Sequence, residues 1–177
     1  EYAIKLGEQG GADLLIATDP DADRLGAAVR LPDGRYEVLT GNQIGAIMIR
    51  YILEAHKQAG TLPDNAVVLK SIVSSELATT IADAYNVKMV DVLTGFKFIA
   101  EKIQQYEDDH SQTFMFGFEE SYGYLIKSFV RDKDAIQALV LLAEVAAYYK
   151  KQGKTLYDGL QDIFEEYGYY AEKTISK

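Results

Sequence analysis

Residues 66–76 read AVVLKSIVSSE, and this stretch decides the fold of the chain. Its first seven residues, 66–72, form a mostly apolar run rich in Val and Leu, which is typical of a strand buried on both faces. The serines that follow suit the beginning of a helix, and we expect Ser74 to cap a helix that runs to about Tyr85. A buried strand followed directly by a helix is the repeating unit of a parallel α/β sheet.

The same alternation continues on both sides of this stretch. A break at residues 40–42 precedes an expected helix to about Ala59, because apolar residues recur there with helical spacing at Ile44, Ile47, Met48, Tyr51, Ile52 and Ala55. Downstream we expect strands at 88–93, 114–116 and 125–129, an acidic loop at 117–124, and helices at 96–106, 132–151 and 155–167. The chain is therefore predicted to be an α/β protein with a mixed, largely parallel sheet flanked by helices on both faces. Active residues of such a fold lie in loops beyond the carboxyl ends of the strands.

Residues 1–39 follow a different pattern. A helix over 2–9 is stopped by two glycines, and a short strand follows over 13–18. Strands at 25–31 and 36–39 flank a Pro-Asp-Gly turn and predict a hairpin, so we place a domain boundary near Thr40. The chain begins with Glu1 rather than Met and ends as a strand pattern starts near Thr174, so we expect it to be a piece of a longer protein.

An acidic loop, Asp19-Pro20-Asp21-Ala22-Asp23-Arg24, follows the first of these strands. Alternate side chains of an extended or looped backbone point the same way, so the three carboxylates can converge on one point. Left alone they would repel and raise one another's pKa, and a hard divalent cation, Mg²⁺ above all, removes that conflict. Two other interpretations stay open: an ordinary acidic turn, and the Asp-x-Asp motif of a haloacid-dehalogenase-type phosphatase, which has Thr or Val after the motif where Asp23-Arg24 stands here.

The composition narrows the classes of partner. The 177 residues carry a net charge of −9, which argues against binding to nucleic acid, and no apolar run is long enough to span a bilayer. The absence of cysteine excludes a disulfide framework and thiol catalysis, and it is compatible with the cytoplasm. An anionic small molecule can still bind where cations are placed locally, and the cations near motifs are Arg24, Lys70, Lys97, Arg131 and Lys133.

Two loops combine a lysine with the beginning of an expected helix. Lys70 and the serines after it lie where a strand meets a helix N-terminus, which suits an anion, although an ordinary capped helix explains the same residues. In the segment Thr94-Gly95-Phe96-Lys97, the glycine allows close backbone approach and the lysine can reach a phosphate or a hydroxyl. The competing interpretation is a solvated lysine on a helix face.

A third loop, residues 117–124, places Glu119, Glu120 and Ser121 between two glycines. Carboxylates and serine are groups that proteins use to bind vicinal sugar hydroxyls, because a carboxylate accepts two hydrogen bonds. A polar turn with a local serine cap is the competing interpretation.

Taken together and in this order, the motifs resemble those of the α-D-phosphohexomutases, the phosphoglucomutase and phosphomannomutase superfamily. The magnesium loop of that family, D-G-D-G-D-R, is similar to residues 19–24, with Pro20 and Ala22 in place of the two glycines, as in the phosphoglucomutase-like subgroup. The sugar loop, G-E-x-S-G-H, resembles residues 117–124, and alignment on Glu-x-Ser assigns the sugar-binding roles to Glu119 and Ser121, with Tyr124 near the family histidine. Residues 94–97 resemble the T-G-W-K segment, and residues 131–134 resemble an R-E-K-D stretch.

The resemblance implies an enzyme that interconverts hexose 1-phosphate and hexose 6-phosphate through a phosphoserine and a sugar bisphosphate. Asp19, Asp21 and Asp23 would bind Mg²⁺, and Arg24 and Lys97 would act in catalysis. The substrate-binding residues would be Glu119, Ser121, Thr94, Gly95 and Lys70. The substrates would be glucose 1-phosphate, glucose 6-phosphate and glucose 1,6-bisphosphate.

The resemblance also implies a domain assignment. Residues 1–39 would be the C-terminal part of family domain 2, residues 40–168 would be domain 3, and residues 169–177 would lead toward domain 4. The phosphoserine loop of domain 1 and the phosphate loop of domain 4 have no counterpart in this sequence, so we expect the chain alone to be inactive. A rival interpretation is a non-catalytic module that binds a phosphosugar or a metal ion.

Overall fold

The computed structural model describes residues 2–172 of the chain, and the strand expected near Thr174 lies outside the described residues. The helices are α1 (Tyr2–Gly10), α2 (Gly41–Gln58), α3 (Glu76–Ala84), α4 (Phe96–Asp109), α5 (Ala135–Lys151) and α6 (Leu156–Tyr167). The strands are β1 (Leu14–Thr18), β2 (Leu25–Arg30), β3 (Tyr36–Val38), β4 (Ala66–Ser71), β5 (Lys88–Val92), β6 (Thr113–Glu119) and β7 (Gly123–Leu125).

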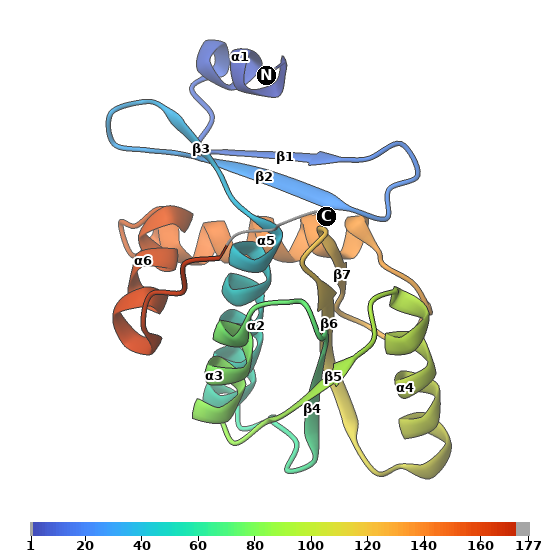
Figure 1. Ribbon diagram of the computed structural model, residues 1–177. Coiled ribbons are helices and arrows are strands. Elements are labelled where there is room, and N and C mark those ends of the chain that lie inside the picture. Colours follow the sequence, from blue (N-terminus) through green and yellow to red (C-terminus); the bar gives the residue numbers. More distant parts are fainter. Residues whose placement is uncertain (1, 173–177) are drawn as a thin grey trace.

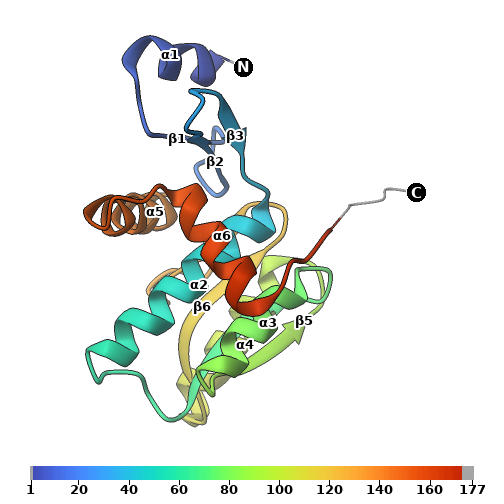
Figure 2. The same cartoon turned by 90° about the vertical axis from the view of Figure 1, so that its left-hand side faces the viewer.

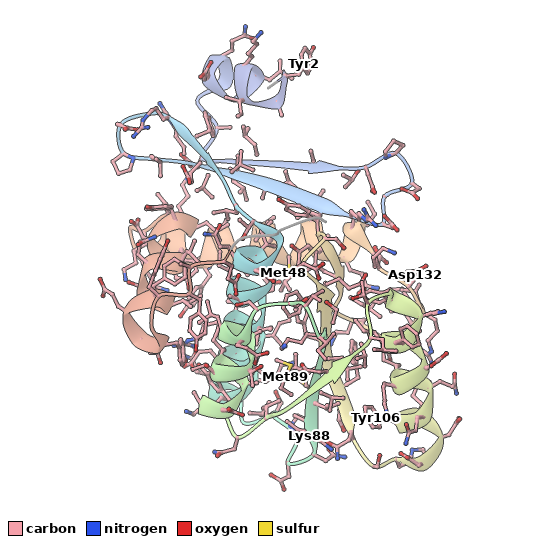
Figure 3. The ribbon with its side chains drawn as sticks, viewed as in Figure 1. Tyr2, Met48, Lys88, Met89, Tyr106 and Asp132 are labelled. Atoms are coloured by element: carbon pink, nitrogen blue, oxygen red, sulfur yellow. The ribbon has the colours of Figure 1, made fainter. Side chains whose placement is uncertain are left out.

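The main sheet has the strand order β5-β4-β6-β7. Strand β4 runs parallel to both of its neighbours, and only β7 is antiparallel, to β6. Alternate side chains of β4 enter different cores: Val68 packs with α2 and α3, whereas Val67 and Leu69 pack with α4. The sheet is therefore mixed, largely parallel and covered by helices on both faces, as predicted, with α2 and α3 on one side and α4 on the other (Figure 1). Met48 of α2 lies fully buried in the larger core (Figure 3).

Strands β1, β2 and β3 form a second, fully antiparallel sheet. The predicted hairpin of β2 and β3 is confirmed, and β1 pairs with the other edge of β2. This sheet rests on α5 and α6, and Leu25, Ala27 and Val29 of β2 belong to the same buried cluster as α2 and α5 (Figure 2). The acidic loop is thus built on a sheet that packs directly on the larger α/β unit.

The boundaries around the expected acidic loop were wrong. Strand β6 continues through Gly117 to Glu119, and β7 begins at Gly123, so the turn is only residues 120–122 rather than 117–124, and no strand covers 126–129. The reason is tertiary: Gly117 pairs with Leu125, and a Cβ at Gly117 would lie 3.0 Å from the Ile99 side chain of α4. A sequence argument based on glycine as a breaker could not see this close packing.

Two helix starts also differ from expectation. The cap of α3 is Ser75, whose hydroxyl accepts from the Leu77 N–H, and not Ser74. Helix α5 begins at Ala135 rather than near Asp132, because the Asp134 carboxylate accepts from the N–H groups of Ile136 and Gln137. The predicted cap of α6, Thr155, is confirmed as one half of a capping box with Asp158.

Candidate functional site

The acidic loop is a six-residue turn closed by the pairing of Thr18 with Leu25. Asp19 organises the turn, since its Oδ1 accepts the N–H groups of Asp23 at 3.2 Å and of Arg24 at 3.0 Å. The backbone at Ala22 is left-handed, with φ of 56°. In this conformation Asp19, Asp21 and Asp23 each place one carboxylate oxygen within 4.8 Å of the others.

The charges around this turn are unbalanced. Hydrogen bonds from the backbone of Arg24 and then of Asp23 lower the pKa of Asp19, which keeps it ionised. The Lys133 ammonium lies 2.9 Å from Asp23 Oδ2 and 3.2 Å from Asp132 Oδ1. Burial by itself lowers the pKa of Lys133, but the bonds to Asp23 and Asp132 outweigh burial and raise it. Arg24 Nε also lies 3.9 Å from Asp23 Oδ1, so both close cations are on Asp23. The three converging carboxylates form a donor set that fits a hard divalent cation.

Backbone hydrogen bonds join this turn to the turn that follows β6. The Leu25 N–H donates to Tyr122 O at 3.0 Å, and Arg24 forms an isolated β-bridge with Gly123. The Ala22 carbonyl accepts from Ala135 N, at the beginning of α5, at 3.0 Å. The acidic turn and the predicted sugar-binding turn are therefore held side by side.

Gly123 leaves room for the Lys133 side chain at this junction. A Cβ there would lie 2.3 Å from Lys133 Cδ, so the absence of a side chain allows the lysine stem to cross the strand and reach Asp23. Lys133 also lies over the Phe96 ring, with Nζ 5.7 Å from its centroid, which connects the acidic turn to the beginning of α4.

The turn before α4 completes the arrangement. Glu119, which is buried, accepts the Gly95 N–H at 2.7 Å, and Gly95 has φ of 119°, a conformation that favours glycine. Thr94 and Lys97 are exposed beside this contact, and Ser121 is half-buried in the turn between β6 and β7. Lys97 makes no ion pair with any residue between 2 and 172, and its ammonium lies 4.8 Å from the Phe98 ring centroid. The predicted residues of three separate loops thus meet at one edge of the molecule.

Lys70 lies apart from this group. Its side chain is fully buried, and Nζ contacts Asp91 Oδ1 at 2.9 Å, Glu76 Oε1 at 3.0 Å and Ser74 O at 3.3 Å. An ammonium has three N–H donors, so these contacts leave none for a substrate. The arrangement supports a structural role rather than the predicted substrate contact.

Tyr124, aligned near the family histidine, is a core residue. It is fully buried, stacks on Phe116 and Phe118, and donates its hydroxyl to Gly41 O at 2.9 Å. Its side chain therefore points away from the converging loops.

Sequence reasoning left two residues of this region without a role. Lys133 was noted only as a nearby cation within the segment 131–134, and Glu120 was grouped with Glu119. The spacing of Lys133 from Asp23, over a hundred positions along the chain, hides their contact, so only the family-like R-E-K-D pattern could have pointed to it.

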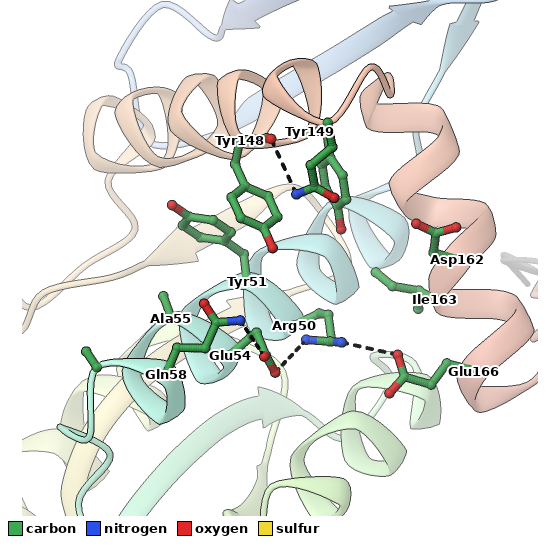
Figure 4. Close-up of a pocket in the computed structure, with 12 residues that line it drawn as sticks. Arg50, Tyr51, Glu54, Ala55, Gln58, Tyr148, Tyr149, Asp162, Ile163 and Glu166 are labelled. Atoms are coloured by element: carbon green, nitrogen blue, oxygen red, sulfur yellow. Dashed lines mark hydrogen bonds and ion pairs between the residues drawn. The ribbon is translucent and has the colours of Figure 1, made fainter.

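Two hollows lie away from these loops. A cavity of about 550 Å³ between α2, α5 and α6 is crossed by Arg50, which pairs with Glu54 at 3.0 Å and Glu166 at 3.2 Å (Figure 4). A more apolar groove of about 720 Å³ lies between α2, β6 and α5. Neither is lined by a residue of the predicted site. Within residues 2–172, no helix combines the length and the apolar character needed to cross a membrane.

A family model and two curated relatives that match this chain point to the same family. The family model described as phosphoglucomutase/phosphomannomutase, alpha/beta/alpha domain III, matches residues 40–167. A phosphoglucomutase of Staphylococcus haemolyticus is 43% identical over 177 residues, and one of Staphylococcus aureus strain N315 is 46% identical over 176 residues. The alignments cover 100% and 99% of this chain, and the chain spans 31% of the length of each relative.

Solved structures share the fold at lower sequence identity. Parafusin, a phosphoglucomutase from Paramecium in its open form, gives a TM-score of 0.67 at 17% identity, covering 89% of this chain and 25% of that chain. Aspergillus fumigatus N-acetylphosphoglucosamine mutase, in complex with GlcNAc-6P and magnesium, gives a TM-score of 0.62 at 15% identity. The match covers 90% of this chain and 39% of that chain. With a family model that matches residues 40–167 and relatives that align with nearly the whole sequence, the chain belongs to the phosphoglucomutase/phosphomannomutase family.

Proposed function

We propose that the intact protein is a phosphoglucomutase-like phosphotransferase that interconverts hexose 1-phosphate and hexose 6-phosphate through a phosphoserine and a sugar bisphosphate. The observation that carries this proposal is the junction of the acidic turn with the turn after β6, through the Leu25 N–H and Tyr122 O. A mutase needs a cation site for the transferred phosphoryl group next to a site for sugar hydroxyls, and this junction places candidates for both side by side.

The acidic turn would hold Mg²⁺ through Asp19, Asp21 and Asp23, whose converging oxygens fit that ion. When bound, the ion supplies positive charge to stabilise the oxygens of the phosphoryl group. Arg24 and Lys97 are exposed cations beside the site, and in the proposal they orient and neutralise the phosphate. Lys133, whose ammonium lies 2.9 Å from Asp23 Oδ2, would hold that carboxylate in place beside the ion.

The sugar would be bound by Glu119 and Ser121, with Thr94 and Gly95 beside them. Glu119 uses one oxygen on the Gly95 N–H, which orients its carboxylate toward the Thr94–Gly95 turn and leaves the second oxygen for a hydroxyl. The proposed substrates are glucose 1-phosphate and glucose 6-phosphate, with glucose 1,6-bisphosphate as the intermediate, and the proposed location is the cytoplasm.

The domain assignment belongs to the same proposal. Residues 1–39 would be the C-terminal part of family domain 2, residues 40–168 would be domain 3, and the segment from 169 would lead toward domain 4. The match of the domain III family model to residues 40–167 supports this division. The phosphoserine would come from a part of the intact protein outside this sequence, so the 177-residue chain alone would bind the cation but not turn over substrate.

The proposal is tested by assaying the intact protein with glucose 1-phosphate and Mg²⁺, using a coupled measurement of glucose 6-phosphate. We expect conversion that requires the divalent cation and is absent from the isolated chain. Binding of sugar phosphate without conversion by the intact protein would instead support a non-catalytic binding module.

A further inference from the structure

Two adjacent glutamates in the predicted sugar-binding turn contact different parts of the molecule. Glu119 accepts the Gly95 N–H of the turn between β5 and α4. Glu120 accepts from Ser71 and Ser74, in the loop between β4 and α3. Glu119 is the last residue of β6 and Glu120 is the first residue of the turn, so the two side chains leave the chain on either side of the strand end.

The contacts of Glu120 form a small buried network. Its Oε2 lies 2.8 Å from Ser71 Oγ and 3.2 Å from Ser74 Oγ, and its own N–H donates to Ser74 Oγ at 3.0 Å. The two serine hydroxyls lie 2.7 Å from each other, and both serines are buried. Buried polar groups are costly when unpaired, so this network favours one placement of the turn over all others.

The backbone of Glu120 is confined from the opposite side by α2. A Cβ on Gly41, the first residue of α2, would lie 1.9 Å from Glu120 O, so the helix start and the turn touch through their backbones. Tyr124, three residues after Ser121, is anchored to the same helix start through Gly41 O. The turn that carries Ser121 is therefore clamped between the β4–α3 loop and α2.

We propose that Glu120 is a positioning residue that sets where Glu119 and Ser121 present their oxygens to the sugar. The inference rests on the proposed function, because sugar binding by Glu119 and Ser121 is part of it. Glu120 Oε2, which is occupied by the two serines, acts through these neighbours. Removing it would loosen the turn without removing any group that is proposed to bind sugar or metal.

The test uses the intact protein with Glu120→Ala, Glu120→Gln and Ser74→Ala, and with Glu101→Ala, an exposed glutamate of α4, as the matched control. The readout is the ratio of kcat/KM for glucose 1-phosphate to that for mannose 1-phosphate. Both kcat/KM values are proportional to the concentration of folded enzyme, so that concentration cancels in the ratio. A variant that only lowers the fraction of folded protein would therefore leave the ratio unchanged.

We expect the ratio to shift about tenfold from its wild-type value in Glu120→Ala, because small misplacements of binding groups have large effects on reactivity. Gln keeps an oxygen acceptor at the same place, so Glu120→Gln should retain the ratio, as should the control. An unchanged ratio in both Glu120→Ala and Ser74→Ala would overturn the proposal.

Hydrogen exchange at the Gly95 N–H gives a second measurement that does not depend on catalysis. This N–H is bonded to Glu119, so a displaced Glu119 should speed its exchange in Glu120→Ala and leave it unchanged in Glu120→Gln. If the wild-type protein converts neither sugar, the proposed function fails, and the exchange rates still decide the role of Glu120. Equal exchange in all variants would contradict the positioning role.

Discussion

The acidic turn of residues 19–24 and the cluster around Lys70 are both dense groups of charge, yet they are built in opposite ways. In the turn, three carboxylates converge and remain partly exposed, and the two close cations, Lys133 and Arg24, both pair with Asp23. In the cluster, one fully buried ammonium is surrounded by two carboxylates and a carbonyl oxygen. The turn has unused acceptors that face solvent, whereas every donor of Lys70 is occupied.

The difference separates charge available for a ligand from charge that stabilises the fold. An accessible group of converging like charges gains free energy when it binds an ion of opposite charge. The Lys70 ammonium is buried and all of its donors are occupied, so it has no such capacity, and removing it destabilises the protein. Both groups lie near the ends of strands, so position alone does not distinguish them.

The largest effect on activity is expected from a substitution in the acidic turn, which tests whether its charges serve a ligand. Asp21→Ala should abolish Mg²⁺ binding measured by calorimetry and lower kcat/KM of the intact protein on the order of 10²- to 10³-fold, because the cation would lose a ligand. The free energy of unfolding should not fall, since one of three repelling carboxylates is removed. Asp33→Ala, in the turn between β2 and β3, is the matched control, and Mg²⁺ binding that survives in Asp21→Ala would count against the site.

The next largest effect is expected in the Lys70 cluster. Lys70→Ala should lower the free energy of unfolding in urea by about 2–3 kcal/mol, through the cavity left by the stem and the broken ion pairs. The estimate stays at this level because the Glu76 and Asp91 side chains, 63% and 43% exposed, can regain water.

Mg²⁺ affinity should stay unchanged in Lys70→Ala. Lys88→Ala, an exposed lysine of β5, should leave stability unchanged and serves as the control. A stable Lys70→Ala protein with weakened substrate binding would reverse the assignment of Lys70 to structure.

A smaller effect, on activity rather than stability, is expected when Lys97 is replaced. Lys97 is exposed and unpaired among the described residues, so Lys97→Ala should leave stability within about 0.5 kcal/mol of wild type. We expect kcat/KM to fall about tenfold, which corresponds to about 1.4 kcal/mol. Lys102→Ala, on the same helix, should change neither quantity, and equal activities of the two variants would remove Lys97 from the site.

The smallest effect concerns acid stability. Hydrogen bonds from Thr79 and then from Lys70 lower the pKa of Glu76 from its usual 4.5. A carboxylate with a lowered pKa stabilises the fold above its usual pKa, and the contribution is lost as pH falls through the lowered value. Glu76→Gln should therefore reduce the loss of stability between pH 7 and about pH 3, by less than about 1 kcal/mol because the group is exposed. Urea unfolding of both proteins at the two pH values measures this loss, and an equal loss in the variant and the wild type would show that the hydrogen bonds from Thr79 and Lys70 do not stabilise the Glu76 carboxylate.

Much of the fold was predictable because its signals are local. The Val-rich run of β4 and the apolar stripe of α2 predicted their elements. The alternation of strands and helices predicted a largely parallel sheet, and the parallel pairing of β4 with β5 and β6 confirms it. The errors fall where distant contacts override local propensity. Gly117 looked like a loop residue, yet it lies inside β6 because α4 packs close to it.

The candidate site shows the same contrast between local sequence signals and contacts formed only on folding. The acidic motif, the glycine before α4 and the Glu-x-Ser segment could be recognised from residue type and spacing, because these express their chemistry directly. Only the tertiary structure decided that Lys133 reaches Asp23, that Lys70 is fully paired and that Glu119 and Glu120 have different partners. Whether a charge is free or satisfied depends on how the folded chain orients the side chains. The partners of Lys70 include Ser74 and Glu76, which are close in sequence, whereas Lys133 pairs with the distant Asp23, so sequence spacing alone does not reveal either contact.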